Sequence, residues 1–330
     1  MEEKLLTISI AAYNMEKFIE CCVDSVLNPK LCPIIEVLIV NDGSTDNTLS
    51  IALDYQKRYP DTIRVIDKQN GGYGSATNTA IDAASGKYFK TLDADDWFDS
   101  KTFERFIEHL KTVDVDLIIT NYSQEFEPSK TSYPICYSGV KHGKIYDFNK
   151  FCIMDKTRMP GFAMHAITYR SEILKIDGFR VSECYYSDVD YSVYPLVNVK
   201  SVVFFDLILY KYRIGRAEQS VGSVGLVRHF NDHLYVCKKL VDYYTDYQAE
   251  NNATISLNIG YNAAEVVSNL ISVMFGQLYY SDRDHAKKQI HEFMLYLKEK
   301  DSDLLELATD RVAYFGKIIA LKEQKQQMSY

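Results

Sequence analysis

The N-terminal part of the chain alternates between short apolar runs and longer amphipathic stretches, and this alternation restricts the fold more than any other feature of the sequence. Apolar and β-branched runs typical of buried strands occur at Leu5–Ala11, Glu36–Val40, Thr62–Ile66, Lys87–Leu92 and Leu117–Thr120. Strands separated by helices of about ten to fifteen residues are joined by right-handed crossovers, which place the strands parallel. We therefore expect an α/β fold with a mostly parallel sheet flanked by helices.

The stretches between these runs have helical spacing. Residues 15–27 place apolar side chains three or four positions apart, and Asn14 precedes them where a helix cap is expected. The polar turn Asp42–Asp46 leads into a second helix, and the glycine-bearing loop Asn70–Gly74 opens a third. The pattern thus predicts a helix after each of the first three strands.

Polar segments follow directly after three of the strands. They are Asp42, the loop that begins at Asn70, and Asp93–Asp96. The carboxyl ends of parallel strands meet at one edge of the sheet, and ligands of such folds bind at that edge. The sequence therefore predicts that these segments converge on one binding site.

The segment Asp93-Ala94-Asp95 has the chemistry of a cation site. On an extended backbone, residues two apart point to the same side, so Asp93 and Asp95 would share one face. Neighbouring carboxylates repel each other unless a cation lies between them or one is protonated. Oxygen ligands suit Mg²⁺ or Mn²⁺ bound to a diphosphate. The alternative is an acidic turn that caps a helix beginning near Ser100.

The rest of the chain is less regular and then helical. Residues 121–220 contain short strand-like pieces, whereas helical patterns occupy 227–245, 256–280, 284–299 and 302–325. We expect one domain over residues 1–222 and a helical domain over 223–330. The helix at 256–280 carries one formal charge but several Asn and Gln side chains, which favours a buried helix over a membrane span.

Composition excludes several classes of protein. The formal net charge is −8 with both signs well mixed, so we expect no nucleic-acid partner. The seven cysteines form no CxxC pair, which indicates thiols in a reducing compartment. The chain begins with a charged tetrapeptide and a strand-like run, so we expect no signal peptide and a cytoplasmic location. The mildly basic segment Lys317–Gln326 is interpreted as a solvated helix end, with peripheral contact at the inner membrane face as the alternative.

Short motifs occur in a recognisable order at Ser9–Asn14, Val40–Asp46, Asn70–Gly72 and Asp93–Asp96. In this order and spacing they resemble the inverting family 2 glycosyltransferases, which have the Rossmann-like GT-A fold. The resemblance is dense over residues 5–98, patchy to about residue 220 and not recognisable in the helical tail. It implies a catalytic GT-A domain that binds a nucleotide-diphospho-sugar donor.

On the nucleotide side, the resemblance assigns Asp42 to the hydrogen bond with the base, usually uracil. It places Ala12 and Tyr13 in the wall of the base pocket, although Ala12 stands where the family commonly has proline. Asn70 and Gly71 match the loop that approaches the nucleotide, because a glycine permits close backbone contact. The alternative for Asp42 is an Asx turn before a helix.

On the diphosphate side, the resemblance places Asp93 near the ribose and makes Asp95, together with Asp93, the ligands of Mn²⁺ or Mg²⁺. Ala94 and Asn78 belong to the same nucleotide-sugar site by position. Thr77 precedes Asn78 where many relatives have arginine, a departure that changes how the diphosphate or sugar is held.

The catalytic base is expected further along the chain. Asp188 aligns with the family's base, and Asp190 is the fallback. A carboxylate there would take the proton of the acceptor hydroxyl. Ser187 stands where the family often has glutamate, and the alternative is that these acids simply start a helix. Tyr185 and Tyr186 are candidates to stack on a sugar.

Arginines in the segment Tyr210–Ser220 leave two interpretations open. Arg213 or Arg216 could bind phosphate, since a guanidinium suits it, and the alternative is that both are surface arginines. His165 lies where relatives sometimes place residues that face the acceptor, but we interpret it as structural, because a lone histidine usually is.

The resemblance implies a metal-dependent inverting transferase whose nucleotide diphosphate donor is expected to be UDP-linked. Because the Gln-x-x-Arg-Trp motif of processive synthases is absent, we expect transfer of a single sugar. Acceptors in the family include glycans, lipid-linked glycans and glycoproteins. The helical tail would shape the acceptor site or join two chains as a homo-oligomer. One alternative is a sugar-1-phosphate nucleotidylyltransferase, although Ala11–Glu16 lacks its phosphate loop. The other is a non-catalytic module that binds a nucleotide sugar or a partner.

Overall fold

The computed structural model describes residues 4–153, 162–176, 178–216, 219, 225, 228–249, 260, 263–264, 266–271 and 283–310. The chain divides into two compact units, Met1–Gln219 and Ser220–Tyr330, and each is described by itself.

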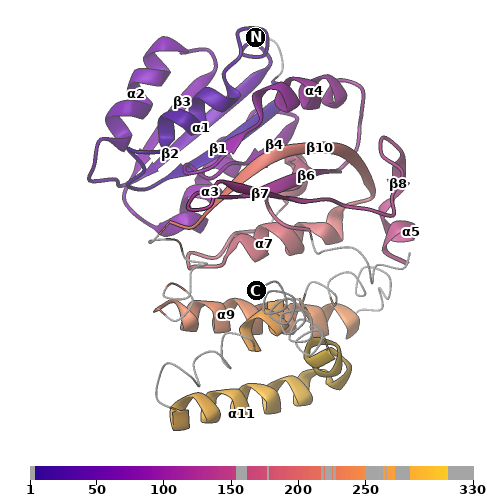
Figure 1. The fold of residues 1–330 in the computed structure, drawn as a ribbon. Helices are drawn as coiled ribbons and strands as arrows, with labels where there is room; N and C mark the ends of the chain where they lie inside the picture. Colours follow the sequence, from indigo (N-terminus) through magenta and orange to yellow (C-terminus); the bar gives the residue numbers. More distant parts are fainter. Residues whose placement is uncertain are drawn as a thin grey trace, which may run out of the picture. The chain divides into compact units, whose positions relative to one another are not determined.

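One ten-stranded sheet forms the centre of the first unit (Figure 1). Its strands, in spatial order, are β3 (Ile63–Lys68), β2 (Ile35–Asp42), β1 (Leu6–Ala12), β4 (Tyr88–Thr91), β9 (Ile167–Arg170), β6 (Leu117–Phe126), β10 (Ser201–Ile214) and β5 (Trp97–Phe98). Off this path, β7 (Thr131–Ile135) pairs with β6 and β8 (Ile145–Asp147) pairs with β10. The predicted α/β fold is confirmed.

Strand direction divides the sheet into two parts. From β3 to β4 every pairing is parallel, as the crossover pattern predicts. Beyond β4 the sheet is mixed, because β9 runs antiparallel to both β4 and β6, while β6 and β10 are parallel to each other. The parallel part brings the ends of β1, β2, β3 and β4 to one edge, which is where the predicted polar segments lie.

Helices cover both faces of the sheet (Figure 1). Their bounds are α1 Ile19–Val26, α2 Thr48–Arg58, α3 Gly72–Ala83, α4 Ser100–Leu110, α5 Phe148–Ile153, α6 Ser171–Leu174, α7 Asp188–Val193 and the 3₁₀ helix η1 Tyr194–Asn198. Side chains alternate between the faces along β2: Val37 packs in the core with α1, α2 and α4, whereas Leu38 packs in the core with α3, α6 and α7. The sheet therefore separates two hydrophobic cores.

Two predicted helix starts differ in outcome. The helix expected near Ser100 is α4, and the side chain of Asp99 caps it by accepting a hydrogen bond from the backbone N–H of Thr102 at 2.9 Å. The prediction that Asn14 caps the first helix is wrong, because α1 begins only at Ile19. Asn14 instead adopts φ +54° and its side chain accepts the backbone N–H of Thr45 at 2.8 Å. It joins the loops that follow β1 and β2.

The second unit contains α9 (Phe230–Ala249), α11 (Arg283–Lys300) and a helical segment over 302–310. The Tyr296 hydroxyl of α11 bonds to Lys238 O and to an Asp242 carboxylate oxygen of α9, both at 3.1 Å. Most of the helix predicted at 256–280 and the whole segment 317–326 lie outside the described residues. No helix within the described part of the chain combines the length and the hydropathy required to span a bilayer.

Gly86 offers a test of how closely the chain packs against the backbone of β1 in the first unit. A Cβ atom at Gly86 would lie 2.5 Å from Thr7 N and 2.7 Å from Leu6 C, which are backbone atoms of β1. We expect Gly86→Ala to lower the free energy of unfolding by about 2 kcal/mol, because overpacking against backbone cannot be relieved by a rotamer change. Urea unfolding measures this change.

Ser85→Ala is the matched control. The Ser85 side chain is exposed, and only its backbone N–H, which alanine keeps, bonds to Glu36 at 2.9 Å. Equal stabilities of Gly86→Ala and Ser85→Ala would contradict the close approach of Gly86 to the backbone of β1.

Candidate active site

Asp42 ends β2, and its carboxylate holds the loop that follows β3. It accepts hydrogen bonds from Lys68 Nζ at 2.7 Å and from the backbone N–H groups of Gly71 and Gly72 at 3.0 and 2.7 Å. Asn70 donates from its side-chain amide to Asp42 O at 2.9 Å. These bonds leave lone-pair capacity on Oδ2. The predicted nucleotide residues Asp42, Asn70 and Gly71 therefore lie together at the sheet edge.

Glycine is required where these two loops meet. Gly43 has φ +73°, and a Cβ there would lie 2.8 Å from Asn70 N. A Cβ at Gly71 would lie 2.6 Å from Ser75 Oγ. At Gly43 the missing side chain lets backbone approach backbone, whereas at Gly71 it leaves room for the Ser75 and Lys68 side chains.

The end of β1 contributes one accessible side chain. Ala12 is buried and packs in the core that contains α1, so its methyl group points away from the rim. Tyr13, the next residue, has 48% of its surface exposed. Of the two residues predicted to line the base pocket, Tyr13 is the one whose side chain a ligand can reach.

The acidic segment after β4 forms a turn. β4 ends at Thr91, and the backbone N–H of Asp96 donates to Asp93 O at 2.9 Å. The expectation that the strand continues through Asp95, with Asp93 and Asp95 on one face, is therefore wrong. The turn brings Asp96 beside Asp93, and Asp95 Oδ2 instead lies 3.2 Å from Arg216 Nη1.

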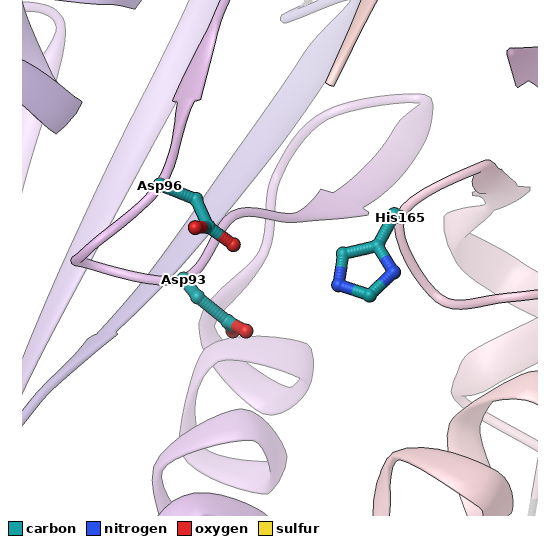
Figure 2. A group of neighbouring side chains, drawn as sticks. All are labelled: Asp93, Asp96 and His165. Carbon is teal, nitrogen blue, oxygen red and sulfur yellow. The ribbon is translucent and has the colours of Figure 1, made fainter. Parts of the chain in front are cut away.

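His165 completes a cluster with these aspartates. One ligand atom each of Asp93, Asp96 and His165 lies within 4.8 Å of the others. Figure 2 shows the two aspartates on one turn with His165 facing them from a separate segment. The His165 ring stacks on Tyr212 and Tyr122, with centroids 4.3 and 5.2 Å away. This aromatic packing fixes the direction in which the imidazole points.

Electrostatic crowding makes this cluster suitable for a cation. Burial, together with the charges of Asp95 and Asp188, raises the pKa of Asp93 to about 8. Burial and the charges of Asp95 and Asp93 raise the pKa of Asp96. Burial, and secondarily the charge of Lys90, lowers the pKa of His165 to about 3, so the imidazole is neutral.

The donor set also fits a divalent cation. His165 Nδ1 is buried and has no hydrogen-bond partner among the described residues. Carboxylate oxygens and a neutral imidazole nitrogen suit Mn²⁺, and the carboxylates alone suit Mg²⁺. The predicted ligand Asp93 thus belongs to the cluster, whereas Asp95 is held by Arg216.

Lys90 supports this cluster from within the sheet. It is fully buried, and its Nζ donates to His165 O at 2.8 Å and to Ile167 O at 3.0 Å. Burial lowers the pKa of Lys90 to about 7. The lysine therefore ties the His165 segment to β4, the strand that leads into the aspartates.

The loop before α7 is anchored on α3. The side-chain amide of Asn78 both donates to Val181 O and accepts from Val181 N, at 2.9 Å each. A Cβ at Gly74 would lie 2.0 Å from Ser182 O, so only glycine lets the loop approach this closely. The Asn78 amide, predicted to bind the nucleotide sugar, is occupied here with positioning this loop.

The two acids of α7 have different environments. Asp190 is fully buried, and its Oδ2 accepts the backbone N–H of Ser182 at 2.8 Å. Asp188 lies close enough to Asp93 to raise the pKa of that residue. Burial, with a smaller contribution from Asp190, raises the pKa of Asp188 itself to about 6. Asp188 faces the aspartate cluster, whereas Asp190 holds the loop.

Arg213 bonds to the acidic turn through its backbone and its side chain. Its backbone N–H donates to Asp96 Oδ1 at 2.7 Å, and its Nε donates to Asp95 O at 2.6 Å. The guanidinium packs 4.7 Å from the Trp97 ring centroid and pairs with Glu127. Of the two arginines considered for phosphate binding, Arg213 is committed to protein partners.

The sequence patterns missed three members of this site. The charge of Asp93, after burial, raises the pKa of the Tyr73 hydroxyl, so Tyr73 lies near the cluster. It directly follows the predicted Asn70–Gly72 motif, so its position was a usable indication. His165 was interpreted as structural, and Lys90 was read only as part of a strand. Nothing in the local sequence distinguishes these two, because their roles depend on contacts made between β4 and the His165 segment.

The chain matches the family model described as "Glycosyl transferase family 2" over residues 7–174. It is 40% identical over 130 residues to the uncharacterized glycosyltransferase EpsJ of Bacillus subtilis, a match that covers 39% of this chain and 37% of that relative. This chain therefore corresponds to well under half of EpsJ. The uncharacterized glycosyltransferase RP339 of Rickettsia prowazekii is 30% identical over 235 residues, covering 69% of this chain and 70% of its own.

Among solved structures, TarS 1–349 of Staphylococcus aureus superposes with a TM-score of 0.62 and 16% identity, covering 94% of this chain and 88% of that one. The same TarS segment in complex with UDP-GlcNAc gives a TM-score of 0.55 and 17% identity, with 93% and 82% covered. At this identity the likeness is one of fold, and it confirms the GT-A prediction.

His165→Ala tests the cluster as a cation site. We expect this variant to bind Mn²⁺ about tenfold more weakly or worse, because it removes a nitrogen ligand and leaves crowded carboxyls. Electron paramagnetic resonance of free Mn²⁺ measures the affinity without any nucleotide. His109→Ala is the control. His109 lies on α4, stacks on Phe205 of β10 and is not part of the cluster. Unchanged Mn²⁺ affinity in His165→Ala would assign the histidine a packing role alone.

Proposed function

The chain belongs to glycosyltransferase family 2. We propose that it transfers a single sugar from a UDP-linked donor to a hydroxyl, with inversion at the anomeric carbon. The observation that carries this proposal is the convergence of Asp93 and Asp188. These residues lie far apart in the chain, yet Asp188 is close enough to Asp93 for its charge, after burial and the charge of Asp95, to raise the pKa of Asp93. A cation-binding group and a proton acceptor therefore share one site, as sugar transfer requires.

The donor pocket in this proposal lies at the loops after β1, β2 and β3. Asp42 accepts from the base through its remaining lone pair, and Tyr13 packs against the base. The TarS segment, which shares the fold, has been solved with UDP-GlcNAc, and this supports a UDP-linked donor. A base without the matching N–H donor would leave a buried carboxylate oxygen unpaired, which disfavours its binding.

Asp93, Asp96 and His165 would hold the cation, with Asp95 as a further oxygen ligand. When bound, a divalent cation neutralises the diphosphate and makes it a better leaving group. Lys90 keeps His165 in place by bonding its carbonyl oxygen. The aromatic rings around His165 exclude water from that side of the site.

Asp188 is the proposed general base. As the acceptor oxygen attacks the anomeric carbon, the bond from that carbon to the diphosphate oxygen breaks, and the hydroxyl proton passes to the Asp188 carboxylate. A pKa raised to about 6 makes this carboxylate a better proton acceptor than an exposed aspartate while leaving it mostly ionised at neutral pH. Asp190 is a positioning residue, because it holds Ser182 in the preceding loop.

The acceptor in this proposal is a glycan, a lipid-linked glycan or a glycoprotein. Residues 1–222 would form the catalytic domain and residues 223–330 a helical domain that shapes the acceptor site or pairs two chains. Tyr185, which is exposed and lies three residues before Asp188, would contact an acceptor sugar in this proposal.

Thermal unfolding with UDP, GDP or CMP, each with Mn²⁺ or with a chelator, tests the donor proposal. A ligand at about 100 times its dissociation constant adds about 2.7 kcal/mol of stability. We expect UDP with Mn²⁺ to raise the melting temperature by several degrees and the rise to vanish on chelation. A chain that no nucleotide stabilises would be better described as a non-catalytic module.

Asp188→Asn tests the base through hydrolysis of a UDP-sugar, with water as the acceptor. We expect kcat to fall at least about 100-fold, because the amide cannot take the proton, while the stabilisation by UDP and Mn²⁺ is kept. Asp190→Asn should lower stability with a smaller loss of kcat. The reverse order of the two losses would assign the base to Asp190.

The pH profile gives an independent check. The base acts when deprotonated, so kcat/KM should rise with pH through the pKa of Asp188 and then level off. That limb should lie at or below about pH 6, since a bound cation lowers the pKa from the value in the cation-free chain. Initial rates from pH 4.5 to 8 measure it. A limb that persists in Asp188→Asn would arise from another group.

A further inference from the structure

Arg216 forms an ion pair with Asp95 in the acidic turn after β4. Its Nη1 lies 3.2 Å from Asp95 Oδ2, and 15% of its side chain is exposed. The guanidinium packs 4.7 Å from the Phe18 ring centroid, and Nη1 also contacts Met15 Sδ at 3.6 Å. Arg216 therefore reaches the site over the loop that follows β1.

The bonding of this guanidinium is incomplete. Arg216 Nε is buried and has no hydrogen-bond partner among the described residues. A buried donor without an acceptor costs free energy, so the group favours an additional acceptor oxygen. Arg213 differs in this respect, because it bonds to Asp95 O, Asp96 and Glu127. Of the two arginines, Arg216 is the one with a buried donor that has no partner among the described residues.

The backbone that carries Arg216 is held in place. The side-chain amide oxygen of Gln219 accepts from Gly215 N at 2.9 Å and from Arg216 N at 3.2 Å, and its amide nitrogen donates to Arg213 O. A Cβ at Gly215, which has φ +105°, would lie 2.7 Å from Pro128 Cδ. A change in the partner of Arg216 therefore requires only a side-chain movement.

The Asp95 carboxylate is a possible partner for two positive groups, the Arg216 guanidinium and the proposed divalent cation. Its carboxylate pairs with Arg216 in this structure, while the proposed function makes it a ligand of the divalent cation beside Asp93. A guanidinium and a divalent cation on one carboxylate repel each other at short range. Binding of one therefore disfavours the other at Asp95.

We propose that Arg216 binds the diphosphate of the donor. Without a divalent cation it pairs with Asp95, and it would leave Asp95 when the cation binds there. The inference rests on the proposed function, in which the cation and the diphosphate bind together. The cation displaces the guanidinium from Asp95. The released Nη1 and the unpartnered Nε then bond to diphosphate oxygens, a geometry for which a guanidinium is suited.

The exchange predicts opposite effects of one substitution on two ligands. In Arg216→Gln, Mn²⁺ without nucleotide should bind about threefold to tenfold more tightly, because the competing charge is gone. UDP at saturating Mn²⁺ should bind about tenfold more weakly, because charge-assisted hydrogen bonds are lost. Paramagnetic resonance of free Mn²⁺ and calorimetric titration with UDP measure the two affinities.

Lys211→Gln is the control for net charge. Lys211 lies on β10 and its Nζ is 3.5 Å from Glu125, so its removal takes one positive charge from the same strand without touching Asp95. We expect both affinities to stay close to those of the unmodified chain. Arg216→Lys should keep the competition for Asp95 but lower the affinity for UDP, because an ammonium lacks the planar, bidentate hydrogen-bonding geometry of a guanidinium.

Asp95→Asn isolates the pair. In the Asp95→Asn background, Arg216→Gln should no longer tighten Mn²⁺ binding, because the shared carboxylate is absent. Mn²⁺ affinity that is unchanged or weaker in Arg216→Gln would overturn the exchange, and unchanged UDP affinity would overturn the role in diphosphate binding. Thermal unfolding of each variant confirms that it is folded.

Failure of the proposed function would look different. If no nucleotide stabilised the unmodified chain with Mn²⁺, the transferase proposal would fail. The Mn²⁺ titrations without nucleotide would still show whether Arg216 and the cation compete for Asp95.

Discussion

The carboxyl groups of Asp93, Asp95 and Asp96 are crowded into one turn after β4, and much of the surrounding structure accommodates them. The Tyr210 hydroxyl and the Arg213 backbone N–H donate to Asp96, at 2.7 Å each. Arg216 pairs with Asp95. Burial, together with the charges of Asp95 and Asp188, still raises the pKa of Asp93 to about 8. The remaining electrostatic strain is what a divalent cation would relieve, so the crowding links the packing of β10 to the chemistry of the site.

A second constraint is the close contact between α3 and the loop before α7. Asn78 bonds the backbone of Val181 in both directions, and Gly74 leaves room for Ser182 O. The buried Asp190 bonds the same loop from the other side. Together they set where Asp188 lies relative to Asp93, although most of these residues need not touch a ligand. Residues of this kind look like binding residues in a motif, yet they act through position.

Local sequence predicted the elements well where periodicity was strong. The apolar runs became β1 to β4 and β6, and the polar segments after β2, β3 and β4 lie at the edge where they were expected. Boundaries and directions were less predictable. Asn14 has the chemistry of a helix cap but takes φ +54° and bonds Thr45, because a partner from the next loop is available. The antiparallel β9 was not evident from the sequence, since its pairing partners are distant in the chain.

The sequence by itself determined the α/β fold, the order of the polar loops and the identity of most acids in the site. These follow from hydrophobic periodicity and from the rule that parallel strands end at one edge, both of which act over short stretches of chain. The tertiary structure decided which acids meet. It placed Asp96 and His165 beside Asp93, gave Asp95 to Arg216, and put Asp188 rather than Asp190 toward the cluster. Those outcomes depend on a turn after β4 and on contacts between segments far apart in the chain, where charge and burial are balanced only once the fold has formed.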